Sequence, residues 1–137
     1  MRLYLSSFRM GDHPEYLTAL VGDRGRRAVV IANALDDAPQ EIRRAGVERE
    51  LAALGELGFD AAELDLRDYF NDSDGLRRDL SQVALAWLRG GNVFMLRYAL
   101  RHSGGHDAFT GLLAEDALVY ARIQCRAVRL VPEPARA

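Results

Sequence analysis

The chain has 137 residues, enough for one domain with a hydrophobic core and too few for two of ordinary size. Its 49% hydrophobic and 28% charged residues are typical of a globular protein and exclude a disordered one. The formal net charge of −2 argues against a nucleic-acid partner, because acidic residues offset the many arginines. The single cysteine, Cys125, cannot form an internal disulfide. With no signal peptide and no apolar run of roughly 20 residues, we expect a cytoplasmic protein without a membrane partner.

Continuous apolar runs alternate with stretches of helical periodicity along the chain. The run Ala28–Ile31 is typical of a strand that is covered on both faces, and Pro39 and Gly58 mark the start and end of the clearest helix. The polar stretch 72–80 predicts at most a helical turn. Strands are expected at residues 2–7, 27–35, 59–66, 83–88 and 117–121, and helices at 13–20, 40–57, 93–103 and 106–116.

This alternation predicts a three-layer α/β fold, with a mostly parallel sheet covered by helices on both faces. We expect residues 1–121 to form this domain and residues 122–137 to form an aberrant tail, its proline-containing end disordered. In such sheets ligands bind at the carboxyl ends of the strands.

The segment Gly90-Gly91-Asn92 occupies such a strand end and opens a helix. Glycines there allow a sharp turn and close approach of a ligand, and free N–H groups could hold an anion or an oxyanion. The alternative is an ordinary turn in which Asn92 caps the helix. The segment is neither a dinucleotide-binding fingerprint nor a phosphate-binding loop, since G-x-G-x-x-G is absent and no lysine follows.

Other candidates favour structural explanations. The serines at the end of the first strand are expected to cap an element or form a turn. The scattered histidines are expected to hold no metal, and the acidic pair is expected to lie in a solvated loop. Two arginines on one helix face are expected to be exposed, and the tryptophan to belong to the core. We expect no metal or other cofactor. These residues are Ser6, Ser7, His13, His102, His106, Asp72, Asp74, Arg97, Arg101 and Trp87.

Several segments, in this order, resemble the peptidase E (aspartyl dipeptidase) family and its cyanophycinase relatives: SS at 6–7, VVIANA at 29–34, ERELAALGELGF at 48–59, ELDL at 63–66, LRGGNVFMLRYALRHSG at 88–104 and LVYA at 118–121. The family pattern G-G-N-T-x-x-L is matched except that Val93 replaces the threonine. The resemblance implies a class I glutamine amidotransferase-like α/β fold and a peptidase of short peptides. It also implies that Gly90, Gly91 and Asn92 form an oxyanion and substrate-binding turn, with Gly91 N–H in the oxyanion hole.

The chain departs from the family where the nucleophile should stand. After a strand like VYA the family has a serine elbow, G-[YW]-S-A-G, whereas this chain has Arg122-Ile123-Gln124-Cys125-Arg126. The nucleophile position falls on Gln124, and no catalytic residue is retained. The codons CGG ATA CAG TGC CGG encode this pentapeptide, and removing the first base yields Gly-Tyr-Ser-Ala-Gly. We therefore hypothesise a one-base frameshift near codon 122, natural or introduced during sequencing.

The resemblance thus implies a serine-type peptidase acting on short peptides, including those with an N-terminal aspartate, that is inactive in this chain. The alternative is a non-catalytic binding or interaction protein on the same scaffold. A sheet cut after residue 121 is expected to leave an unpaired edge that can pair with a second copy. It is also expected to deprive strands 27–35 and 83–88 of core partners, which would make the chain marginally stable.

Overall fold

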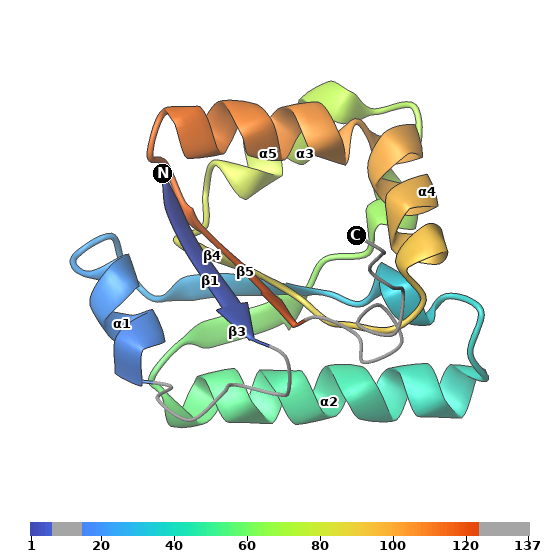
Figure 1. The fold of residues 1–137 in the computed structure, drawn as a ribbon, viewed down its shortest axis with the longest axis horizontal. Coiled ribbons are helices and arrows are strands. Elements are labelled where there is room, and N and C mark those ends of the chain that lie inside the picture. The colour runs from blue at the N-terminus through green and yellow to red at the C-terminus, as the bar shows by residue number, and fades with distance from the viewer. Residues whose placement is uncertain (7–14, 124–137) are drawn as a thin grey trace, which may run out of the picture.

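The computed structural model describes residues 1–6 and 15–123 (Figure 1). Within these residues, five strands form one parallel sheet in the order β1-β5-β4-β2-β3. The strands are β1 (Arg2–Ser6), β2 (Arg27–Ile31), β3 (Asp60–Glu63), β4 (Leu85–Leu88) and β5 (Val119–Ile123). The helices are α1 (Glu15–Val21), α2 (Gln40–Glu56), α3 (Ser73–Leu80), α4 (Val93–Ser103) and α5 (Gly105–Ala114), with two 3₁₀ turns, η1 (Asn33–Leu35) and η2 (Leu66–Tyr69).

Helices cover both faces of the sheet, which confirms the predicted fold class. Helices α1 and α2 lie on one face, and α3, α4 and α5 lie on the other (Figure 1). Each face has its own apolar cluster, and the side chains of Leu85–Leu88 alternate between the two clusters. This is why β4 reads as an unbroken apolar run: every one of its residues is buried. No helix in the described residues is both long and apolar enough to cross a bilayer.

Several boundaries differ from those predicted. Strand β2 ends at Ile31 rather than residue 35, because Asn33–Leu35 forms the 3₁₀ turn η1. Strand β3 ends at Glu63 rather than residue 66, because the 3₁₀ turn η2 begins at Leu66. Residues 73–80 form a full helix rather than a turn, since the Asp72 side chain accepts a hydrogen bond from Gly75 N–H at its start. Strand β5 continues through Arg122 and Ile123, which pair with Leu88 and Ser6 on the neighbouring strands.

The helical periodicity of the sequence predicts an apolar face on α2 made of Ile42, Ala45, Val47, Leu51, Leu54 and Leu57, and the structure confirms it only in part. Ile42 is 58% exposed and Ala45 is exposed, whereas Gly46, Val47, Glu50 and Leu54 are buried. The face that meets the sheet therefore includes a charged residue. Sequence periodicity could not place this face, because the helix has no strong contrast between an apolar and a polar side.

The expected loss of core partners by β2 and β4 is wrong. Strand β2 pairs with β3 and β4, and β4 pairs with β2 and β5, so each has a neighbour on both sides. Among the described strands the edges are β1 and β3. The central strands therefore keep their hydrogen bonds and their apolar contacts.

A buried carboxylate links α2 to the middle of the sheet. Glu50 is 3% exposed, and its Oε1 accepts a hydrogen bond from Trp87 Nε1 at 2.9 Å. Its Oε2 lies 3.1 Å from Nε of Arg89, an ion pair whose angles are not those of a hydrogen bond. Trp87 is fully buried, which confirms its assignment to the core. A buried charge is tolerated here because both carboxylate oxygens have cationic or N–H partners.

We predict that Glu50→Ala lowers the free energy of unfolding by about 3 kcal/mol, because it leaves the Trp87 N–H and the Arg89 guanidinium without their partner. Glu48→Ala, at an exposed position on the same helix, should change it by no more than about 0.5 kcal/mol. Urea unfolding followed by Trp87 fluorescence measures both. Equal effects of the two substitutions would show that the Glu50 contacts contribute nothing.

Candidate functional site

The parallel sheet brings the carboxyl ends of its strands to one edge. Leu88 pairs with Ile31 on one side and with Arg122 on the other, and Ile123 pairs with Ser6. The turn after β4 therefore begins beside the carboxyl end of β5, at nearly the same level. Gln124, the position implied for a nucleophile, is the next residue after β5 and lies outside the described residues.

The turn after β4 requires glycine at position 91. A Cβ on Gly91 would lie 2.7 Å from the carbonyl oxygen of Ala34 and 3.0 Å from Leu35 Cδ2. The Ala34 oxygen belongs to the backbone of the turn after β2 and cannot move aside cheaply. The next residue completes the contact, because Asn92 N–H donates to Ala34 O at 2.8 Å. The turns after β2 and β4 are thus held together at backbone distance.

Asn92 caps α4, as the structural alternative predicted. Its Oδ1 accepts hydrogen bonds from Phe94 N–H at 2.9 Å and Met95 N–H at 3.4 Å. Its Nδ2 donates to Asp37 Oδ2 at 2.8 Å. Both ends of the side-chain amide are therefore used within the protein, and the side chain of Asn92 serves to orient the turn.

Two backbone N–H groups of the turn are unused within the described part of the chain. Among the described residues, the N–H groups of Gly90 and Gly91 have no hydrogen-bond acceptor. A main-chain N–H beside the end of β5 is the kind of group that stabilises a developing oxyanion or a bound carboxylate. Gly90 and Gly91 lie beside the end of β5, and their role in an oxyanion-binding turn stays a prediction.

We predict that Gly91→Ala destabilises the protein by about 1–3 kcal/mol, because the added methyl group would overlap the Ala34 carbonyl. Gly55→Ala is the matched control: Gly55 lies inside α2, where an added Cβ would meet no atom within 4 Å beyond the surrounding helix backbone, and alanine is the better helix former. It should stabilise the protein by about 0.5–1 kcal/mol. Thermal unfolding distinguishes the two, and stabilisation by Gly91→Ala would contradict the close approach.

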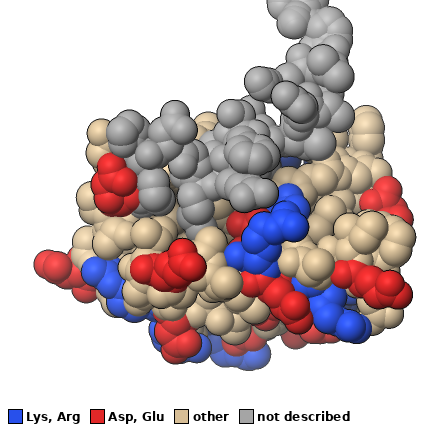
Figure 2. All heavy atoms as spheres, turned by 90° about the horizontal axis from the view of Figure 1, so that it is seen from below, with Lys and Arg blue, Asp and Glu red and all other residues tan. Residues whose placement is uncertain are grey.

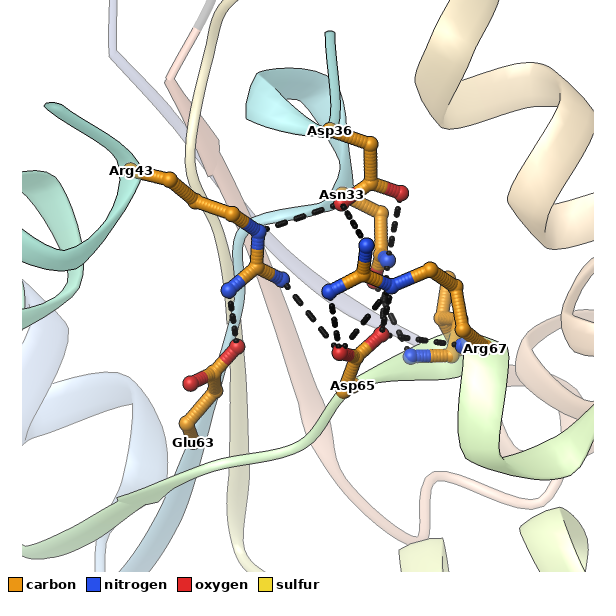
Figure 3. Close-up of polar contacts among 7 residues, drawn as sticks. Asn33, Asp36, Arg43, Glu63, Asp65 and Arg67 are labelled. Atoms are coloured by element: carbon orange, nitrogen blue, oxygen red, sulfur yellow. Dashed lines mark hydrogen bonds and ion pairs between the residues drawn. The ribbon is translucent and has the colours of Figure 1, made fainter. Parts of the chain in front are cut away.

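A polar cluster lies at the carboxyl ends of β2 and β3 (Figure 3). At its centre is Asn33, which is fully buried. Its Nδ2 donates to Asp36 Oδ2 at 2.8 Å and to Asp65 Oδ1 at 2.9 Å, and its Oδ1 accepts from Leu66 N–H at 3.0 Å. One side chain thereby joins the turn after β2 to the turn after β3.

Two arginines surround this centre. Arg43, from α2, donates to Asp36 at 3.1 Å and to Glu63 at 2.7 Å, and its Nη2 lies 3.7 Å from Asp65 Oδ2. Arg67 donates to Asp65 through both Nε and Nη2, the latter at 2.7 Å. The pKa of each guanidinium is raised: the hydrogen bonds to Asp65 dominate for Arg67, and for Arg43 the carboxylates outweigh burial, which acts to lower it.

The pKa of Asp65 is lowered to about 2. Burial acts to raise it, but hydrogen bonds from Arg67 and Asn33 to the carboxylate outweigh that effect. The carboxylate is therefore ionised at neutral pH, and every charged group in the cluster faces an opposite charge. We interpret the cluster as a structural network that fixes two strand ends and the start of α2. Sequence reasoning missed it, although Asn33 and Asp65, polar residues near the ends of two predicted strands, were the available signal.

Acid should weaken this network in a defined pH range. The folded-state pKa of Asp65 lies below its unfolded value of about 3.9, so its contribution to stability is present above pH 4 and is lost as the pH falls towards 2. We predict that Asp65→Asn is less stable than the unsubstituted protein at pH 6, and that the difference narrows between about pH 4 and pH 2. Asp23→Asn, in an exposed loop, is the control and should follow the unsubstituted profile. A constant difference for Asp65→Asn would contradict this interpretation.

The remaining predicted residues lie elsewhere or outside the described ranges. His102 and His106 line an open groove of about 730 Å³ on α4 and α5, together with Phe94 and Tyr98, and not the glycine turn. Within the described residues no group of three His, Cys, Asp or Glu could hold a metal ion. Asp74, Arg97 and Arg101 are exposed, as expected of solvated groups, and Asp72 caps α3. Ser7, His13 and Cys125 are not described, and for Ser6 only the backbone position at the end of β1 is known.

Comparison with known proteins supports the fold. No family model matches the sequence. No curated protein matches it either. Among solved structures, a crystal structure of a candidate peptidase E from Listeria monocytogenes EGD-e superimposes with a TM-score of 0.71 at 21% identity. The match covers 89% of this chain and 57% of that one. This chain therefore has a peptidase E-like fold and spans little more than half the length of that protein.

Proposed function

We propose that this chain is a peptidase E-like scaffold that keeps the oxyanion and substrate-binding turn of a serine-type peptidase but does not catalyse hydrolysis. The substrate class that the turn would recognise is a short peptide, with an N-terminal aspartate as one candidate. The observation that carries the proposal is the position of the turn. Gly91 N–H has no described acceptor, and the adjacent strand β5 leads directly to Gln124.

The chemistry of a serine peptidase explains why the residue after β5 decides activity. A serine hydroxyl attacks the peptide carbonyl, a histidine accepts its proton, and backbone N–H groups hold the negative oxygen that forms. The carboxamide of Gln124 has no hydroxyl or thiol to form an acyl intermediate. An oxyanion-binding turn alone supplies only a small part of the rate enhancement of such enzymes, because nucleophile and base act as a unit.

A non-catalytic binding role is the second candidate, and the distribution of charge is compatible with it. On the face that carries α2, acidic and basic side chains are intermixed (Figure 2). A mixed surface of this kind offers no broad field to attract nucleic acid, so a protein or peptide partner is the better fit.

We predict that the purified 137-residue chain does not turn over a fluorogenic Asp-X substrate. The matched positive control is a full-length peptidase E assayed under the same conditions. Binding of the unlabelled Asp-X peptide, followed by changes in amide chemical shift, should perturb Gly90 and Gly91 with a dissociation constant of about 1 mM or weaker. Turnover that a serine-directed inhibitor abolishes would overturn the claim of inactivity, whereas unchanged Gly90 and Gly91 signals would overturn the claim of binding.

The frameshift hypothesis has its own test. The nucleotide sequence from codon 115 to a few hundred bases beyond codon 137 should encode, in the second frame, the serine elbow and then a histidine-bearing α/β segment. An uninterrupted frame that encodes Arg122–Arg126, with no such segment in either alternative frame, would rule it out.

A further inference from the structure

The two described edges of the sheet differ in how they are protected against pairing. The β3 edge is short, and it begins with Asp60 and ends with Glu63, both exposed, with two alanines between them. Exposed carboxylates and small side chains are typical of an edge that resists pairing with another chain. As far as the structure describes the chain, strand β1 has no such protection. Its only described partner is β5, and its sequence contains no proline or acidic residue.

Strand β1 exposes an apolar face. Leu3 is 46% exposed, Leu5 is 59% exposed, and Met1, just before the strand, is 72% exposed. Alternate residues of a strand point to opposite faces, so these three share one face. Tyr4 points the other way and packs with Trp87 on the side of α1 and α2. The helices on the opposite side do not reach far enough to cover Leu3 and Leu5, which belong to neither apolar cluster.

Near the start of β1, the described N-terminal ammonium, Arg2 and Arg24 all pair with one carboxylate, that of Asp116. Arg2 donates to Asp116 at 3.0 Å and to the carbonyl oxygen of Leu20, and Arg24 also pairs with Asp116 at 2.9 Å. These contacts hold the start of β1 against the loop before β5. An approaching chain therefore meets a strand that is fixed at its start and exposes an apolar face.

We propose that β1 pairs antiparallel with β1 of a second copy of this chain. A two-fold axis at Tyr4 matches all five residues of the strand, with Arg2 opposite Ser6 and Leu3 opposite Leu5 of the second copy. The contact is self-complementary, because directly opposed leucines on one face stabilise an antiparallel pair. The assembly also stops at the dimer. Pairing about the two-fold axis occupies the β1 edge of both copies, and the acidic β3 edges do not pair with further copies. This proposal is independent of the proposed peptidase-like function.

The contact area sets the expected strength. Three exposed apolar side chains per copy cannot reach the roughly 800 Å² per partner of a standard stable interface. The backbone hydrogen bonds of the ladder must supply the rest. The dimer should therefore exchange with monomer, with a dissociation constant on the order of 10 to 100 μM.

Sedimentation velocity over about 1 μM to 1 mM protein tests the proposal directly. The unsubstituted chain should shift from monomer to dimer. Leu5→Lys should weaken dimerisation by at least about tenfold, because it places a charge against the Leu3 of the second copy. Ala62→Lys, at an exposed position on β3, is the matched control and should leave dimerisation unchanged. Circular dichroism verifies that both variants fold.

The alternative outcomes are distinct. A monomer at every concentration would overturn the proposal and leave a different polypeptide as the occupant of the β1 edge. A series of larger oligomers would overturn closure, and loss of dimer in Ala62→Lys alone would place the interface at β3.

Cysteine cross-linking tests the register. In a Cys125→Ser background, Leu3→Cys mixed with Leu5→Cys should form an intermolecular disulfide under mild oxidation, whereas each variant alone should not. Cross-linking of either variant alone would overturn the two-fold axis at Tyr4.

Discussion

The candidate site depends on the absence of a side chain at position 91. Only glycine lets the turn after β4 approach the Ala34 carbonyl to the distance at which Asn92 N–H can donate to it. That contact sets where α4 begins, and the cap by Asn92 then consumes the first N–H groups of the helix. Counting only acceptors in residues 1–6 and 15–123, the backbone N–H groups of Gly90 and Gly91 remain available at this rim. The sheet register places this backbone beside the end of β5.

Helix α2 stabilises this rim from two directions. Near its start, Arg43 joins the carboxylates that follow β2 and β3, and nearer its end Glu50 accepts from Trp87 and pairs with Arg89, which directly precedes the glycine turn. These ionic groups are buried or half-buried, and Arg43 and Glu50 each have at least two partners. Their loss would be costly because a lone buried charge remains, even though the intact pairs contribute little net stability. They therefore act mainly to position the strand ends.

The sequence could predict the parts of this structure that depend on local pattern. Unbroken apolar runs identified β2 and β4 because both strands are buried on both faces, and the segment before Phe94 identified the cap of α4. Helix α3 was missed because its buried residues, such as Leu76 and Leu80, are outnumbered by charges. The Asn33 cluster was missed because its members come from three separate segments. Strand order could not be predicted at all, because β1 lies beside β5, which is at the far end of the described chain. No local sequence pattern indicates that Leu3 and Leu5 face solvent.

The two proposed sites lie on opposite sides of β5, which is an interior strand of the sheet. Because β5 lies between β4 and β1, the glycine turn is on one side of its carboxyl end and the exposed edge strand is on the other. An antiparallel pair of β1 strands makes the strands of the second copy run in the opposite direction. The carboxyl ends of the two sheets then lie on opposite margins of one continuous sheet. In the proposed dimer the described residues of one copy do not cover the turn of the other, so association through β1 would not block the proposed peptide-binding turn at Gly91.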